Sequence, residues 1–254
     1  MICVNDIYRA LCALAPVELQ MSFDNAGFLV GHGKAEVNTV LLSLDITNEV
    51  IEEALALDAQ LIISHHPVIF HPLRSITSDG EGKLALRLAE NRIAAICMHT
   101  NLDIADGGVN DVLLEKLGAE RDDVLDEDGC GRIGSLPQVM PLSSFLTLCK
   151  ETLQVNALRY VDAGRPVKRI AVMGGSGGDA FQTALQKGCD TYVTADVKYH
   201  QFLDARAAGL NLIDADHFCT ENPVIPAVAE ALCAEFPQLS FRISKQHHQI
   251  ISVY

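Results

Sequence analysis

Apolar and polar positions along the chain fall into short segments that predict strands and helices in alternation. Val37 to Leu44 is a continuous apolar and β-branched run that stops at Asp45, a pattern typical of a buried strand in a parallel sheet. The pattern then predicts, in order, a helix from Thr47 or Asn48 to Leu57, a strand over 61–64, a helix over 83–91 and a strand over 93–98. This alternation indicates an α/β fold with right-handed crossovers.

The second half of the chain repeats the same order. Strands are predicted over 169–173, 191–194 and 211–215, with helices over 180–187 and 202–208. The third strand of each half ends in a His-x-x-x-acid pair, His99 with Asp103 and His217 with Glu221. An internal duplication explains the match. We therefore predict two similar β-α-β lobes, residues 1–124 and 125–254, with a C-terminal strand able to pack back on the first lobe.

Three segments lie outside this repeat. An amphipathic helix capped by Asn5 or Asp6 is predicted to end before Pro16, and residues 22–28 carry turn-forming residues. The segment 122–166 separates the two halves, and the acidic run 120–128 is an expected exposed boundary between them.

Composition and charge narrow the function classes. The chain has 254 residues, with 33 acidic against 19 basic residues and a net charge of −14, so its surface should repel nucleic acid and anionic lipid. The eight cysteines form no C-x-x-C pair, which predicts free thiols in a reducing compartment. The N-terminal segment lacks the features of a signal peptide, and no apolar run is long enough to span a membrane. We expect a cytoplasmic protein.

Candidate metal ligands follow the predicted strands directly, where α/β sheets form ligand crevices. His65 and His66 come after the strand over 61–64, and because Pro67 favours an extended conformation at His66, their imidazoles can diverge toward two metal ions about 3.5–4 Å apart. Asp103, His217 and Glu221 complete a set of three imidazoles and two carboxylates. Zn, Fe(II) or Mn suits this mixture of nitrogen and oxygen. We predict a site for two divalent ions at the strand carboxyl ends between the lobes.

The alternative for any single position is a polar residue at a loop. Taken alone, a histidine at a strand end usually has no further role. The prediction therefore depends on the whole set, because buried polar groups left unpaired would each cost about 1–3 kcal/mol.

Several segments together resemble the signature segments of the GTP cyclohydrolase 1 type 2 homologue family, also called NIF-three-like. They are, in order, SFDNAGFLVG (22–31), SHHPVIFHPLRSI (64–76), HTNLD (99–103), GGSGG (174–178), TADVKYH (194–200) and DADHFCTE (214–221). The resemblance spans nearly the whole chain and implies a dinuclear metal site in two similar α/β lobes, within a ring-shaped hexamer.

Position by position, the resemblance implies metal ligands at His65, His66, Asp103, His217 and Glu221. It also implies that His99 lies close to the metals or faces the substrate. The chain departs from the family where Phe23 replaces a larger aromatic residue, Ala195 a Gly and His71 a Lys or other polar residue, and where Phe218-Cys219 replaces Tyr-Ala. None of these positions is a proposed ligand.

Weaker features keep two interpretations each. The turn GGSGG (174–178) is interpreted as a tight strand-to-helix turn, with phosphate contact as the alternative. Lys198 and His200 are candidates for contact with an anionic substrate, or are exposed loop residues. A buried thiol at Cys219 is favoured over a neighbour of the metals. His247-His248 is expected on a solvated face, with another metal site as the alternative.

Two hypotheses for function follow. Two divalent ions and two carboxylates leave a local charge of about +2, which favours an anionic small-molecule substrate. The first hypothesis is a metal-dependent hydrolase in which a metal-activated water attacks and His99 or His200 moves protons. The family name implies GTP as substrate. The second is a non-enzymatic metal-handling protein or regulatory scaffold with the same five ligands.

Overall fold

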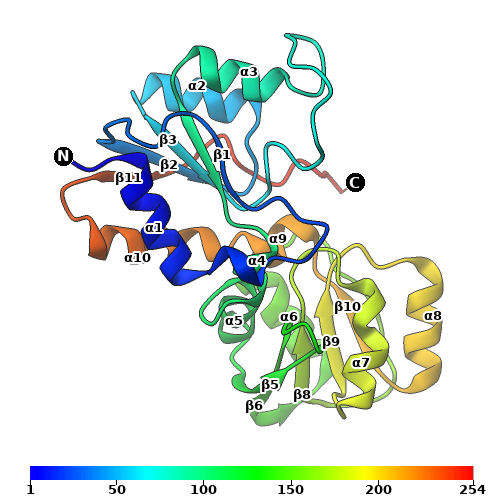
Figure 1. Cartoon of the computed structure of the whole chain (residues 1–254). Coiled ribbons are helices and arrows are strands. Elements are labelled where there is room, and N and C mark those ends of the chain that lie inside the picture. Colours follow the sequence, from blue (N-terminus) through cyan, green and yellow to red (C-terminus); the bar gives the residue numbers. More distant parts are fainter. Residues whose placement is uncertain (254) are drawn as a thin grey trace. The chain divides into compact units, whose positions relative to one another are not determined.

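Two separate sheets organise the structure, a computed structural model that describes residues 1–253. The first unit comprises Met1–Asp106 and Ile225–His248, and the second comprises Gly107–Val224 and the chain from Gln249 onward (Figure 1). The first unit therefore combines the N-terminal segment with residues 225–248, and the chain crosses from it to the second unit at residue 107. The sequence had placed that boundary at 124/125.

The first unit has a five-stranded sheet in the order β1-β4-β3-β2-β11. Its elements are α1 (Val4–Leu14), η1 (Val17–Leu19), β1 (Gly27–Val30), β2 (Thr39–Ser43), α2 (Asn48–Ala56), β3 (Leu61–Ser64), α3 (Lys83–Glu90), β4 (Ala94–Cys97), α4 (Thr100–Ile104), α10 (Val224–Glu235) and β11 (Ser240–Ile243). Strands β2, β3, β4 and β11 are parallel, and β1 is antiparallel to β4.

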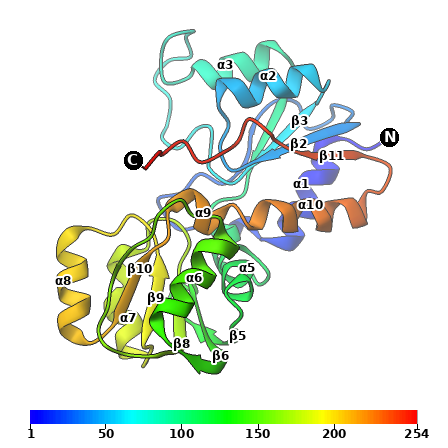
Figure 2. The same ribbon diagram turned by 180° about the vertical axis from the view of Figure 1, so that it is seen from behind.

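Helices cover both faces of this sheet, as its continuous apolar strands require. Leu41, Ile62 and Ala95 pack in one core cluster with α2 and with Leu88 of α3. Alternate residues such as Val40 and Leu61, also fully buried, point to the opposite face. Figures 1 and 2 show α1 and α10 side by side on that face.

The second unit has a six-stranded sheet in the order β5-β6-β8-β9-β10-β7. Its elements are α5 (Val109–Lys116), β5 (Glu120–Val124), β6 (Arg132–Met140), α6 (Leu142–Leu153), β7 (Arg159–Val161), β8 (Val167–Val172), η2 (Gly178–Ala180), α7 (Phe181–Gln186), β9 (Thr191–Thr194), α8 (Tyr199–Ala208), β10 (Asn211–Asp214) and α9 (His217–Glu221). Two core clusters lie on its two faces, one with Ile170 and Val193 under α5 and α6, the other with Tyr192 and Leu212 under α7 and α8.

The predicted α/β fold of two similar lobes is confirmed, and the similarity extends beyond the predicted strands. In each unit three parallel strands run in the order third, second, first, and an antiparallel edge strand pairs with the third: β1 with β4, and β7 with β10. The opposite edges differ, because β2 pairs with parallel β11 whereas β8 pairs with antiparallel β6. The segment 122–166 therefore supplies strands and a helix of the second unit rather than a connection between lobes.

Local predictions needed two corrections. The cap of α1 is Cys3, whose N–H donates to the Asp6 carboxylate at 2.8 Å, rather than Asn5 or Asp6. Strand β1 lies partly in a segment that was interpreted as a turn, and it was missed because its pairing partner β4 is distant in sequence.

Of the helices within residues 1–253, none has the length and apolar character needed to cross a membrane. The eight cysteines are free thiols, and five are buried.

Candidate metal site

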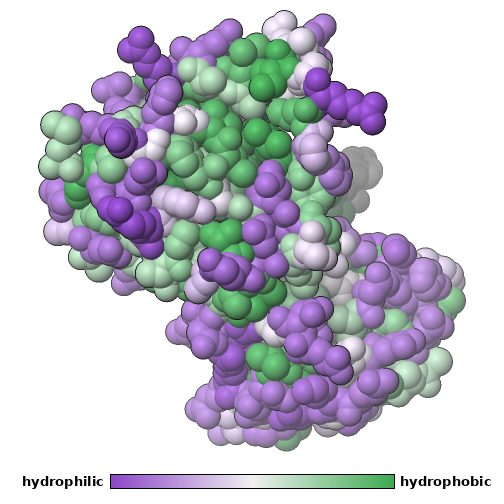
Figure 3. Space-filling view, viewed as in Figure 1, coloured by the Kyte–Doolittle hydropathy of each residue, from purple (hydrophilic) through white to green (hydrophobic). Residues whose placement is uncertain are grey.

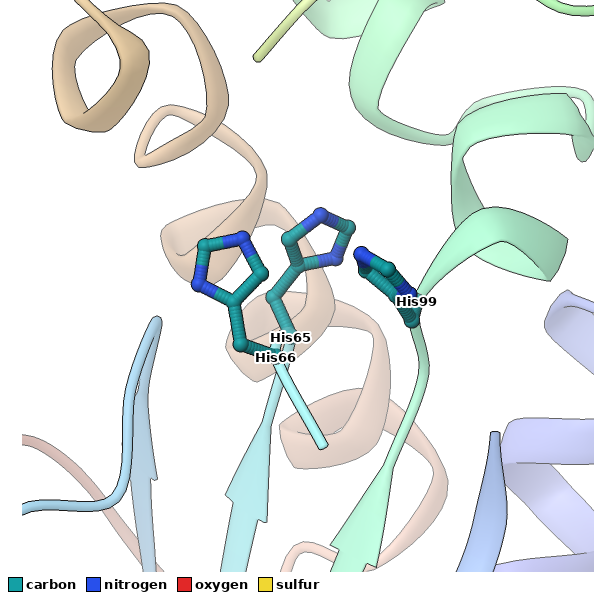
Figure 4. A group of neighbouring side chains, drawn as sticks. All are labelled: His65, His66 and His99. Atoms are coloured by element: carbon teal, nitrogen blue, oxygen red, sulfur yellow. The ribbon is translucent and has the colours of Figure 1, made fainter. Parts of the chain in front are cut away.

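Three histidines of the first unit meet beyond the ends of β3 and β4. The register pairs Ser64 with both Ser43 and Cys97, so β2, β3 and β4 end at the same level. His65 and His66 follow β3, and His99 follows β4. Their ring centroids lie 5.0, 5.2 and 5.5 Å apart, with one ring nitrogen from each within 4.8 Å of the others (Figure 4). The three rings thus converge on a single point beyond the sheet.

The two consecutive histidines converge because the strand has already ended. Strand β3 ends at Ser64, and the backbone N–H of His66 donates to the carbonyl of Leu44 at 2.8 Å. The Nδ1 atom of His65 lies 2.8 Å from the Met98 carbonyl, whereas that of His66 lies 2.8 Å from Asp45 Oδ1. Different acceptors on the two sides therefore hold the neighbouring rings in place.

The hydrogen bonds at Nδ1 decide which nitrogen each ring offers. His99 Nδ1 lies 2.7 Å from Asp24 Oδ1. A carbonyl or carboxylate oxygen can only accept, so Nδ1 of all three rings carries the proton and donates it. In this tautomer Nε2 carries the lone pair that a metal would bind. This arrangement of imidazole and acceptor is the one that metal-binding histidines usually show.

Asp24 is a buried carboxylate that the sequence pattern did not single out. It also accepts hydrogen bonds from the backbone N–H of Thr100 at 2.9 Å and from the Thr100 hydroxyl. Burial raises the pKa of Asp24, but the hydrogen bonds from His99 and Thr100 outweigh it and hold the pKa well below its usual range. The negative charge of Asp24 thus anchors His99 from a loop 75 residues earlier in the chain.

Asp103 lies with the histidines, but on a helix rather than at a strand end. It is the fourth residue of α4, and its Oδ1 lies 3.7 Å from His65 Nε2. The side chain is almost fully buried. The first unit therefore brings together one carboxylate and three imidazoles of the predicted site residues.

The second unit brings together His217 and Glu221 on α9. Four residues apart on one helix, they share a face, and His217 Nε2 lies 3.1 Å from Glu221 Oε2. His217 Nδ1 lies 2.8 Å from Asp196 Oδ2. Burial lowers the pKa of His217, but the contacts with Glu221 and Asp196 raise it to about 9. Without metal, this pair therefore holds a proton near neutral pH.

The GGSGG turn serves these two residues by leaving them room. Gly175 has φ +64°, and a Cβ there would come within 2.1 Å of Glu221 Oε1 and 3.2 Å of His217 Nε2. The N–H of Gly175 donates to the Thr220 hydroxyl at 3.0 Å, and that of Gly174 to the Asn110 side chain at 2.9 Å. Since these N–H groups bind within the protein, the structure favours the tight-turn interpretation over phosphate contact.

The two His-x-x-x-acid pairs are not equivalent in position. Cys97 and Asp214 end the third strand of each unit, so the residues two positions further, His99 and Asp216, correspond. They are the N-caps of α4 and α9, which places His217 one position later, opposite Thr100. The sequence match that suggested the duplication therefore holds for the strands but is shifted by one residue at the site.

Other predicted residues have simpler surroundings. His200 lies on α8 and Lys198 caps that helix, and both are exposed. Cys219 is buried in the second unit's core, as favoured. His71 is exposed and contacts Phe70, whose ring stands edge-on to His99 at 6.1 Å.

His247 does not lie on the solvated face that the sequence predicted. It is half-buried, and its Nε2 accepts the backbone N–H of Leu44 at 2.9 Å. Asp45 and Asp196, which hold ligand rings, are the second residues beyond β2 and β9 and could have been found by the rule that identified the histidines. Asp24 and His247 had no such signal.

These features define a class of protein with two α/β units whose strand ends carry imidazoles and carboxylates suited to metal. The model of the Duf34/NIF3 (NGG1p interacting factor 3) family matches residues 2–249. The chain belongs to this family.

Curated relatives and solved structures agree with this assignment. A protein of Clostridium perfringens named GTP cyclohydrolase 1 type 2 homolog is 37% identical over 252 residues, 96% of each chain. One of the same name from Lactococcus lactis is 38% identical and covers 89% of this chain and 88% of its own. The crystal structure of a Bacillus cereus protein related to NIF3 is 25% identical, covers 100% of this chain and 99% of its own, and has a TM-score of 0.93.

Proposed function

We propose that the chain binds two divalent metal ions through His65, His66, Asp103, His217 and Glu221, and acts as a metal-dependent hydrolase on an anionic small molecule. One observation carries the proposal. His65, His66 and His217 each have Nδ1 bonded to an oxygen that can only accept, so Nε2 is the ligand atom in every case. Packing alone gives no reason for this shared tautomer.

Ligand number supports a common metal centre for the two sets. His217 and Glu221 supply two donors, whereas zinc sites usually take three or four protein ligands. Gly175 leaves room for the Glu221 carboxylate itself, since a Cβ at that position would come within 2.1 Å of Glu221 Oε1. We therefore propose that the donors of both units bind the same pair of ions.

The chain's own residues then bind, orient and protonate a substrate. The bound metals supply Lewis acidity and a local positive charge in an acidic protein. His99 is the proposed proton carrier, because Asp24 orients its ring beside His65 and His66. His200 is the second candidate for this role. The names of the curated relatives make GTP the first substrate to test.

Metal analysis of matched variants tests the shared centre. Protein purified without chelator is expected to hold close to two transition-metal equivalents per chain. His65→Ala in the first unit and Glu221→Ala in the second should each lower the total to well below one equivalent and abolish the rise in melting temperature on adding metal. Loss of only one equivalent in each variant, with the other site intact, would contradict a shared centre, and no metal in the parent after reconstitution would overturn the proposal.

A non-enzymatic metal-handling or regulatory role is the alternative, and turnover separates the two. Metal-loaded parent and Asp103→Ala would be assayed with nucleotides, GTP first, then phosphate esters and cyclic amides. Turnover in the parent that is lost in Asp103→Ala supports the hydrolase. Readily exchangeable metal without turnover on any of these substrates favours the alternative.

We also propose a cytoplasmic homohexamer. On the face in Figure 3, hydrophobic residues gather over the middle of the first unit, whereas the second unit is mostly hydrophilic. An acidic chain can associate only through such apolar surface. Sedimentation at micromolar concentration in physiological salt is expected to give a hexamer, and a monomer would contradict the proposal.

A further inference from the structure

The C-terminal segment after β11 runs along the end of β2. Residues 240–243 pair in parallel with residues 39–42, and the Ser244 N–H donates to the Leu42 carbonyl at 2.8 Å. In the sequence, this segment follows α10 and β11. Because β11 is parallel to β2, the chain leaves β11 at the carboxyl end of β2, the edge of the sheet where the histidines lie.

One carboxylate fixes the course of this segment. Glu53 of α2 accepts hydrogen bonds from the Ser244 hydroxyl, the Lys245 N–H at 3.0 Å and the Gln246 N–H at 3.3 Å. These bonds and the interaction with positively charged Lys245 lower the pKa of Glu53, although burial raises it. The backbone is thus held just before His247.

His247 continues this contact to the strand end itself. Its Nε2 accepts the N–H of Leu44 at 2.9 Å, the first residue beyond β2. The carbonyl of Leu44 in turn accepts the N–H of His66, and the next residue, Asp45, accepts from His66 Nδ1. Leu44 and Asp45 therefore connect His247 to both the backbone and the ring of His66.

We infer that His247 is a positioning residue for the metal ligand His66, through Leu44 and Asp45. This role of His247 rests on the proposed metal site. Loss of the acceptor at position 247 would leave the Leu44 N–H without its partner and loosen the strand end that orients His66. Mutation of a group that hydrogen-bonds to a metal-binding histidine typically lowers metal affinity about 10- to 100-fold. His247 is more remote from the metal, so the effect of its loss is expected near the lower limit of this range.

Cobalt binding to the full-length protein is the test, with affinity from chelator competition and ligand geometry from the visible spectrum of Co²⁺. His247→Leu should lower the Co²⁺ affinity about 10-fold and alter the spectrum. His247→Gln, whose side-chain oxygen can accept the same N–H, should restore most of the affinity. His248→Leu is the matched control, because His248 is the exposed neighbour on the same segment, and it should leave affinity unchanged.

A double-mutant cycle separates positioning from general destabilisation. In an Asp45→Ala background, His247→Leu should have a smaller effect on Co²⁺ affinity, since the connection to the ring is already broken and only the one from the Leu44 carbonyl to the His66 N–H remains. Glu53→Gln, which loosens the anchor and leaves the histidines in place, should lower affinity in the same direction and guards against misfolding of the first variant. Equal affinity in His247→Leu and parent, or a full effect that persists in the Asp45→Ala background, would overturn the inference. Absence of Co²⁺ binding in the parent would instead refute the metal site itself.

Discussion

The two units use the same arrangement of strands but place different residues at the strand ends. Beyond its second parallel strand the first unit has His65 and His66, and the second has Ala195 and Asp196. Beyond the first strand, Asp45 corresponds to Gly175, which has no side chain. The first unit thus offers three imidazoles and one carboxylate, and the second offers one imidazole and one carboxylate.

The shared scaffold determines where donor groups can lie at the strand ends. The residue at each position determines whether that group is an imidazole or a carboxylate. Asp196 occupies the place of His66, yet it serves as an acceptor for His217, as Asp45 does for His66. The second unit therefore assembles the same imidazole–carboxylate pair from other positions. The comparison makes four predictions, from the largest expected effect to the smallest.

Replacing the proposed proton carrier of the first unit should have the largest effect. His99→Ala is expected to lower turnover about 10²- to 10⁴-fold, the usual contribution of a general acid or base. Its metal content should stay unchanged, because His99 is not among the five proposed ligands. Steady-state kinetics with elemental analysis measures both.

The matched substitution for this test lies in the second unit. If turnover falls in His200→Ala and not in His99→Ala, the proton carrier belongs to the second unit. Loss of metal from His99→Ala would make His99 a ligand.

A methyl group in the glycine turn should disable the second unit's donors. Gly175→Ala places a Cβ against Glu221 and His217, so metal affinity is expected to fall about 100-fold, as after loss of a ligand's support. Gly188→Ala is the control: it has a similar backbone angle, φ +79°, and no atom within 4 Å of the added Cβ. Both variants bear the cost of a left-handed conformation. Equal metal affinity in the two would show that the space at Gly175 has no role.

The carboxylates that orient the ligand rings should matter in both units. Asp45→Ala and Asp196→Ala are each expected to lower metal affinity about 10-fold or more, because His66 and His217 lose the acceptor at Nδ1. Chelator competition measures the effect. A large effect in only one of the two variants would show that the units contribute unequally to the metal centre.

Two histidines should give opposite pH dependence to the stability of the metal-free protein. The pKa of His217 is raised to about 9, so its contribution is complete below pH 6.5 and is lost as pH rises toward 9. Burial lowers the pKa of His247 to about 4, together with the nearby His66 and His248, although the carboxylates of Asp45 and Glu53 raise it. Its contribution is present above pH 6.5 and is lost as pH falls toward 4.

Each effect should be on the order of 1 kcal/mol, since both side chains are partly exposed and screened. Denaturant unfolding from pH 4 to 9 measures it. The alkaline loss should disappear in His217→Gln and the acid loss should weaken in His247→Gln. A stability profile that is the same in parent and variants would contradict both assignments.

The fold class and the histidine pairs were predictable, while several of their partners were not. His65 and His66 follow a strand whose apolar run is plain in the sequence, so their position at the sheet edge could be predicted. Asp24 could not be, because it reaches His99 from a loop 75 residues away. Strand β1 was missed for the same reason, since its pairing with β4 depends on a distant segment.

Hydrophobic periodicity by itself determined the alternation of strands and helices, the duplication, and the edge of each sheet where polar side chains gather. These are local properties, because the residue types at neighbouring positions show whether alternate or successive residues are buried. Tertiary structure alone decided which acceptor holds each ring and that the His-x-x-x-acid pairs differ by one residue in register. It also decided the hydrogen bond between His247 and Leu44, which are 203 residues apart in the sequence. Such contacts depend on strand register and on the direction of side chains from separate segments, and neither leaves a periodic signal in the sequence.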